Sequence, residues 1–179
     1  HNLREYLKMF AKKMLYWGKM GSIQQGLTEG NRMGIIASSD THRGLPGSSQ
    51  RGRHAVGGLT AVYAKDLNRS DIWEGFLSRR TYGTTGVRIM LDFEVNGHMM
   101  GEEFKTFSDP VIKVTTAGTS TIRKIDIVKC IYNTSKQCFI SHYKNISKKK
   151  IIFFWTDKNF TEDCLYYVRV IQDDGNMAW

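Results

Sequence analysis

The sequence lacks several features that would point to common protein classes. No stretch approaches about 18 uninterrupted apolar residues, so no transmembrane helix is expected. Residues 1–5 lack both an initiator Met and the charged-then-apolar pattern of a signal peptide. We therefore expect a piece of a longer protein, which leaves the compartment open. No P-loop, dinucleotide fingerprint or G-x-S-x-G element is present, which argues against nucleotide-binding and serine-hydrolase chemistry.

Acidic residues are scarce relative to basic ones. The chain has 17 Asp and Glu against 26 Lys and Arg, a net charge of +9 in 179 residues. Such a charge could favour nucleic acid, an anionic membrane surface or a phosphorylated substrate. The basic residues are scattered, with short clusters such as those at 12–13, 79–80 and 148–150, and no recognition motif accompanies them. We therefore expect a solvated surface, no membrane partner and no nucleic-acid partner; a nucleic-acid surface would require a continuous basic stripe on the fold.

Cysteine is also rare. The three cysteines, Cys130, Cys138 and Cys164, form no C-x-x-C pair and fall in expected strands. Their odd number allows at most one disulfide within the chain. Because free Cys usually behaves as a small core residue, we expect buried thiols in preference to a zinc site.

The most informative stretch that is present is residues 35–42, Ile-Ile-Ala-Ser-Ser-Asp-Thr-His. If residues 35–39 form a buried strand, Asp40 and His42 lie at its carboxyl end, where α/β sheets place their chemistry. Side chains two apart on an extended backbone point the same way, so both can reach one point. Carboxylate and imidazole are good ligands for zinc, manganese or iron. The alternative is an Asx turn, in which Asp40 holds the following loop.

A glycine-rich loop follows the Asp-x-His pair over residues 43–58. Loops of this length in compact domains are usually functional or disordered. Among the histidines other than His42, His54 is the one expected to lie near Asp40, and it is a candidate ligand or acid/base group. Arg43, Arg51 and Arg53 would suit an anionic substrate, because guanidinium pairs bidentately with phosphate or carboxylate. A solvated loop is the alternative, and His98 and His142 are expected on the surface.

Two kinds of pattern divide the chain near Gly86. The first part shows helical periodicity over 3–17 and over 22–32, and Ser22 can cap the second of these helices. Short apolar runs follow at 35–39 and 59–64. Asn68 or Ser70 caps a further helix to residue 80, and its apolar stripe is formed by Ile72, Trp73, Phe76 and Leu77. This order of helices and strands is typical of an α/β domain. The second part alternates over 87–95, has the hairpin signal Asn96-Gly97, and continues with runs at 98–104, 111–116, 122–132, 137–142, 150–155 and 165–172. About seven short strands predict an immunoglobulin-like sandwich. The predicted domains are thus 1–86 and 87–179.

Several motifs together carry a family resemblance. These are Gly-Ile-Ile-Ala-Ser-Ser-Asp-Thr-His at 34–42, Leu-Pro-Gly at 45–47, Gly-Leu-Thr-Ala-Val-Tyr-Ala at 58–64, Arg-Thr-Tyr-Gly-Thr-Thr-Gly at 80–86, and Tyr-Tyr-Val-Arg-Val-Ile-Gln at 166–172. In this combination the chain resembles the C-terminal part of the PHP (polymerase and histidinol phosphatase) superfamily. The carbaryl-hydrolase-like branch of metallohydrolases is the most similar, from about residue 22 to the end.

The resemblance implies a fold, a cofactor and a reaction. The fold would be the C-terminal remnant of a (β/α)₇ barrel followed by the antiparallel β-sandwich, an α+β architecture. Asp40 and His42 match the superfamily's last metal motif, Asp-x-His, and would be ligands of zinc, manganese or iron. The reaction would be hydrolysis of a phosphoester, ester or carbamate by metal-activated water, acting on a small and possibly anionic substrate.

One departure limits this implication. The superfamily's earlier His-x-Asp-x-His-type cluster is absent from the chain. We therefore expect weak metal binding and no activity from this chain alone. The alternative reading is a non-catalytic module, in which the sandwich binds a protein or glycan and the α/β portion is degenerate. The substrate, the metal and the oligomeric state are left open.

Overall fold

A computed structural model of the chain describes residues 22–42, 44 and 57–179. These residues form two short helices and eight strands, and all of the strands pair in one sheet. The helices are α2 (Ile23–Thr28) and α3 (Arg69–Leu77). The strands are β1 (Leu59–Val62), β2 (Thr81–Thr84), β3 (Met90–Val95), β4 (His98–Met99), β5 (Val111–Ile131), β6 (Gln137–Thr156), β7 (Cys164–Gln172) and β8 (Met177–Ala178).

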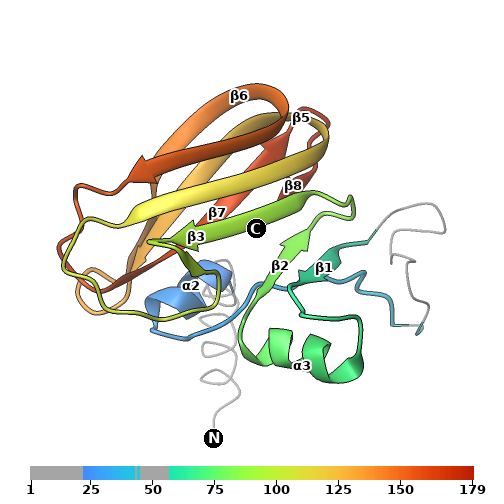
Figure 1. Ribbon diagram of the computed structural model, residues 1–179, viewed down its shortest axis with the longest axis horizontal. Coiled ribbons are helices and arrows are strands. Elements are labelled where there is room, and N and C mark those ends of the chain that lie inside the picture. The colour runs from blue at the N-terminus through green and yellow to red at the C-terminus, as the bar shows by residue number, and fades with distance from the viewer. Residues whose placement is uncertain (1–21, 43, 45–56) are drawn as a thin grey trace, which may run out of the picture.

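Strand β5 organises the sheet. Along one edge it pairs with β6; along the other it pairs with β3 through residues 112–117 and with β7 through residues 122–131. The sheet continues from β7 through β8 and β2 to β1, and every pair is antiparallel. The register of β5 with β6 shifts between Ala117 and Ile122, and bulges of this kind bend a strand. As a result, β5 and β6 curl the sheet into a half-barrel (Figure 1).

The main core lies on one face of the curled sheet. Alternate residues of β3, β5 and β7 turn to this face, as the period of two in a strand requires. Its fully buried members are Ile89, Leu91, Ile112, Val114, Ile122, Ile125, Ile127 and Val170. A smaller cluster lies under α2 and contains Leu27, Val128 and Cys130, with Cys138, Leu165 and Tyr167 packed around it.

Several local predictions are confirmed. The Asn96-Gly97 turn joins β3 to β4, with φ of 53° and 81°, as expected for a type I′ hairpin. Asn68 caps α3 by accepting a hydrogen bond from the Asp71 amide at 2.9 Å. Ser22 caps α2 in the same way, accepting from the Gln25 amide at 3.1 Å. Each of these features depends on a few adjacent residues.

The predicted fold class is wrong. A (β/α)₇ barrel remnant requires parallel strands joined by crossover helices, whereas β1 and β2 flank α3 and pair antiparallel. Strand β2 also pairs with β8, so residues on both sides of Gly86 share one sheet. The later strands are antiparallel as expected, but they lie in the same continuous sheet. The boundary at residues 86 and 87 stays a prediction.

The strand and helix lengths also differ from the sequence-based prediction. The predicted strands at 111–116 and 122–132 are one strand, β5, and those at 137–142 and 150–155 are one strand, β6. The predicted helix at 22–32 ends at Thr28. The expected apolar stripe of α3 is largely exposed: Trp73 and Leu77 keep 63% and 66% of their surface. Among the described residues, no helix is long and apolar enough to cross a membrane.

Candidate functional site

The structure brings Asp40 and His42 together. The Oδ1 atom of Asp40 lies 3.6 Å from Nε2 of His42, and both side chains are more than 70% exposed. Two ligands of one tetrahedral metal at about 2.0–2.2 Å lie roughly 3.4 Å apart. The observed separation therefore fits two ligands that share one ion, and the exposure leaves room for further ligands.

An extended segment, residues 34–39, leads to this pair. It is not a regular strand, contrary to prediction, and Ile36 within it is 62% exposed. Hydrogen bonds attach this segment to β1 and to Gly58, the residue before β1. The Thr60 hydroxyl accepts from the Ala37 amide at 3.0 Å and donates to the Ala37 carbonyl at 2.6 Å. The Gly58 amide donates to the Ser38 carbonyl at 3.1 Å.

Glycines allow this segment to lie against the sheet. A Cβ atom on Gly57 would come within 2.4 Å of the Ser39 Cα, and one on Gly58 within 2.9 Å of the Ala37 Cβ. A Cβ atom on Gly83, in β2, would also lie 2.9 Å from the Ala37 Cβ. Real Cβ atoms do not make contacts this short. Because these glycines carry no side chain, the backbone before Asp40 can lie directly against Gly57, Gly58 and strand β2.

The backbone is unusual at Asp40 itself. Its φ is 55°, in the left-handed region that non-glycine residues rarely adopt. Ser39 supports the turn locally, because its Oγ accepts from the Thr41 amide at 3.4 Å and lies 3.2 Å from the Thr41 hydroxyl. Ser39 thus makes local hydrogen bonds, as expected for a serine without a base partner. Asp adopts the left-handed region more readily than most residues, so this turn needs no glycine at position 40.

The other candidate residues do not add to this pair. Arg43, Arg51, Arg53 and His54 lie outside the described residues, so their predicted roles stay predictions. Within the described ranges, no group of three or more His, Cys, Asp or Glu residues is placed to hold a metal ion. Asp40 and His42 therefore supply two ligands of a site that needs about three from protein.

The two other described histidines have structural partners. His98 Nδ1 lies 2.9 Å from Glu102 Oε2, and its ring stacks on Phe104 at 4.0 Å. His142 stacks on Trp155 at 5.1 Å. Burial and the nearby Lys144 ammonium lower the pKa of His142. Both histidines are partly exposed, and neither lies in a metal-ligand cluster of the described chain.

A cavity of about 770 Å³ is lined by residues of β3, β4 and β7 and of the segments 31–35 and 100–107. Its apolar wall includes Leu91, Phe93 and Val168, and Arg79 and Glu103 supply charge. These two side chains form an ion pair at 2.8 Å. The volume falls in the range of small-molecule sites. The residues come from distant parts of the chain, so no local sequence pattern indicated this cavity.

A buried ion pair was also missed in the sequence. Lys129 Nζ lies 2.8 Å from Asp157 Oδ2, and the two side chains are 3% and 1% exposed. The Tyr166 hydroxyl donates to the same carboxylate oxygen at 2.6 Å. Burial alone would raise the pKa of Asp157, but hydrogen bonds from Lys129, Tyr166 and the Asn159 amide lower it. The group is structural in character, because every polar atom has a partner within the fold.

Comparison with known proteins places the chain in a family. A model of the DUF3604 family, described as a protein of unknown function, matches residues 16–121, which is more than half of the chain. The chain belongs to the DUF3604 family. The matched region includes Asp40, His42 and the β1 and β2 strands that hold their segment.

Relatives of this DUF3604 chain occur in chlamydiae. An uncharacterized protein of Chlamydia trachomatis is 27% identical over 173 residues, covering 89% of this chain and 28% of its own length. Uncharacterized proteins of Chlamydia muridarum and Chlamydia pneumoniae are 28% and 26% identical over the same span. The chain spans about 28% of the length of these relatives. No solved structure matches. Since none of these findings names a hydrolase or a metal, the PHP resemblance stays a prediction.

Proposed function

We propose that this chain contributes two ligands, Asp40 and His42, to the divalent-metal centre of a metal-dependent hydrolase. The remaining ligands would come from polypeptide outside the described residues. The supporting observation is the 3.6 Å separation of Asp40 Oδ1 and His42 Nε2 on an exposed, left-handed turn. The reaction would be hydrolysis of a phosphoester or another ester or carbamate.

The chemistry of the two side chains supports the proposal. A carboxylate and an imidazole together suit zinc, manganese or iron. A divalent cation held there would polarise the scissile bond and supply a nucleophile from water near neutral pH. Asp40 would contribute negative charge and His42 a neutral nitrogen donor. The contacts of Thr60 and Gly58 to the preceding backbone would fix both side chains relative to β1.

The length of the relatives is consistent with a site that is shared between parts of a longer protein. The chain spans about 28% of the chlamydial relatives. The exposure of both side chains leaves room for ligands from other polypeptide. We expect the chain alone to bind metal weakly and to be inactive as a hydrolase.

Calorimetric titration of the chain with Zn²⁺ and with Mn²⁺ tests the ligand assignment. We expect measurable binding that weakens at least tenfold in Asp40→Asn and in His42→Gln, because each change removes one of two ligands. The matched control is His98→Gln, which alters the other exposed His–carboxylate pair, His98 with Glu102. Binding in the control should equal that of the unmodified chain.

Two results would overturn the assignment. One is unchanged affinity in both the Asp40 and the His42 variants. The other is an equal loss in the His98 control, which would mean that any exposed histidine beside a carboxylate binds the ion. Circular dichroism of each variant separates loss of a ligand from loss of the fold, because the exposed Asp40 and His42 side chains make no core contact.

A second candidate function is a non-catalytic binding module. The cavity of about 770 Å³ favours it, since its wall is largely apolar with a few charged groups. In this case Phe104→Ala or Tyr132→Ala, at partly exposed lining residues, would weaken ligand capture, whereas Asp40→Asn would not. Screening the chain against small apolar acids by thermal shift distinguishes this candidate from the metal site.

A further inference from the structure

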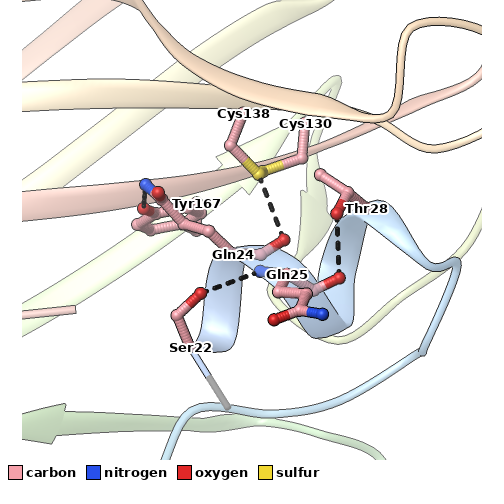
Figure 2. Close-up of a disulfide and its surroundings, with 7 residues drawn as sticks. All are labelled: Ser22, Gln24, Gln25, Thr28, Cys130, Cys138 and Tyr167. Atoms are coloured by element: carbon pink, nitrogen blue, oxygen red, sulfur yellow. Dashed lines mark hydrogen bonds between the residues drawn. A yellow bond between two sulfur atoms is a disulfide. The ribbon is translucent and has the colours of Figure 1, made fainter. Parts of the chain in front are cut away.

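Two of the three cysteines are joined across the sheet. Cys130 of β5 lies directly opposite Cys138 of β6 in the strand register, and the two form a disulfide. Figure 2 shows the disulfide, which joins β5 to β6 and lies next to helix α2. Cys130 is fully buried, whereas Cys138 is partly exposed on a strand at the edge of the sheet. The two sulfurs therefore differ in their access to solution.

The third cysteine is directed elsewhere. Cys164 of β7 lies opposite Ile131, one position along β5 from Cys130. Because successive residues of a strand face opposite sides of the sheet, Cys164 lies on the face opposite to the disulfide. There it contacts Tyr166, and burial raises the pKa of its thiol. Cys164 is a free thiol and is not placed to exchange with the Cys130–Cys138 bond.

Helix α2 rests on the disulfide. The Cys138 Sγ lies 3.6 Å from the Gln24 carbonyl oxygen, and Leu27 packs with Cys130 in one buried cluster (Figure 2). The Gln24 side-chain amide donates to the Tyr167 hydroxyl at 2.7 Å. A helix of six residues is too short to be stable alone, so its order depends on this packing.

We propose that Cys130 and Cys138 form a reversible thiol–disulfide modification site whose oxidised state fastens α2 to the sheet. Its reactants are small dithiols in one direction and small-molecule disulfides in the other. In the reduced state the same helix packs less firmly. The proposal does not depend on metal binding at Asp40 and His42.

The chemistry starts at the accessible sulfur. A thiolate of the external dithiol attacks Cys138 Sγ, the Cys130–Cys138 bond breaks, and Cys130 leaves as a thiolate that takes a proton. The second sulfur of the dithiol then attacks the mixed disulfide, which releases Cys138 and forms the oxidised reagent. Two electrons and two protons pass to the protein in total. In the reverse direction a small disulfide accepts two electrons and leaves as two thiols.

Reduction alters the surface beneath α2. Two bonded sulfurs lie about 2 Å apart, and as thiols they must separate to an ordinary non-bonded distance. Cys130 has no free space, because it is fully buried between β6 and β7. Cys138 must therefore move, and the Gln24 carbonyl is its neighbour on that side. This displacement loosens the contact of α2 with the sheet.

Hydrogen exchange of the full 179-residue chain tests the proposal, with oxidised glutathione and dithiothreitol as the two reagents. We expect peptides covering residues 22–31 to exchange about tenfold faster after reduction, while peptides of β3 change little. Cys138→Ser should show the fast rate with either reagent. Cys164→Ser is the matched control and should respond as the unmodified chain does.

Two outcomes would overturn the proposal. Thiol titration that finds three free thiols after treatment with oxidised glutathione would show that the bond does not form. Equal exchange of residues 22–31 in both states, with the bond confirmed by peptide mass, would show that it does not hold α2. If Cys138→Ser fails to fold, the comparison of reagents on the unmodified chain and on Cys164→Ser still decides the question.

Discussion

Replacing Asp157 by Asn is expected to destabilise the fold strongly. The substitution keeps the shape of the side chain but removes the charge that faces Lys129 Nζ at 2.8 Å. Both side chains are at most 3% exposed, so water cannot replace the lost partner. Removing one member of a buried ion pair typically costs about 3–5 kcal/mol, because the other charge stays buried without compensation.

The predicted loss in the free energy of unfolding can be measured by urea unfolding of the chain, monitored by far-UV circular dichroism. For a chain of this length, about 3–5 kcal/mol corresponds to a fall in Tm of roughly 6–20 °C. The double variant Lys129→Met, Asp157→Asn should recover much of the loss, since no unpaired charge remains. Tyr166→Phe should cost only about 1.5–3 kcal/mol, the range for a hydrogen bond to a charged group.

The same pair predicts a dependence of stability on acid. The folded-state pKa of Asp157 lies below its usual range. Its contribution to the free energy of unfolding is therefore present above the unfolded pKa of about 4 and is lost as the pH falls through the folded value. The Asp157→Asn variant should lack this component. A loss of less than about 1 kcal/mol at neutral pH, or additive effects of the two single changes, would refute the reasoning.

Three further predictions concern other parts of the fold. Gly101→Ala should lower the free energy of unfolding in urea by about 2 kcal/mol or more, because φ is +93° and a Cβ would lie 2.1 Å from a backbone oxygen. Gly97→Ala, at φ +81° with open space around it, should lower it by only about 1 kcal/mol. Since the pKa of His142 is lowered in the fold, its contribution to stability should be present above about pH 6.5 and fall as the solution is acidified below that value, and His142→Phe should flatten that part of the pH profile. Gly57→Ala should weaken metal binding in calorimetry, because the new Cβ would lie 2.4 Å from the Ser39 Cα and would push Ser39 away. A metal affinity equal to that of the unmodified chain would contradict the proposed anchoring of the Asp40 segment.

The sequence predicted features that depend on neighbouring residues. Asn96 and Gly97 predicted a hairpin turn, and the turn has the left-handed angles this pair adopts readily. Asn68 predicted the start of α3 through its capping side chain. The Asp-x-His spacing predicted that Asp40 and His42 could reach one point from an extended strand. They do lie 3.6 Å apart, but on a left-handed turn that the sequence did not predict. In each case the geometry is set over two to four residues.

Long-range pairing was not predictable from the sequence. The pattern of short apolar runs and a helix at 59–80 is the same for a parallel crossover and for the antiparallel β1–α3–β2 unit observed. The pairing of β2 with β8 joins residues more than 90 positions apart, which is beyond the reach of any local pattern. The predicted strands left gaps at 117–121 and 143–149, whereas β5 and β6 continue through these residues, with a shift of register between Ala117 and Ile122.

The sequence by itself determined the local chemistry of this protein: the Asp-x-His pair, the helix caps, the hairpin turn and an odd number of cysteines. Only the tertiary structure decided which distant residues come together. It paired Cys130 with Cys138, left Cys164 on the opposite face and buried Lys129 against Asp157. It also placed the segment before Asp40 against the sheet, at contacts so close that only glycines fit there. The physical reason is that side-chain identity acts over a few bonds, whereas strand register decides which distant residues share a face of the sheet.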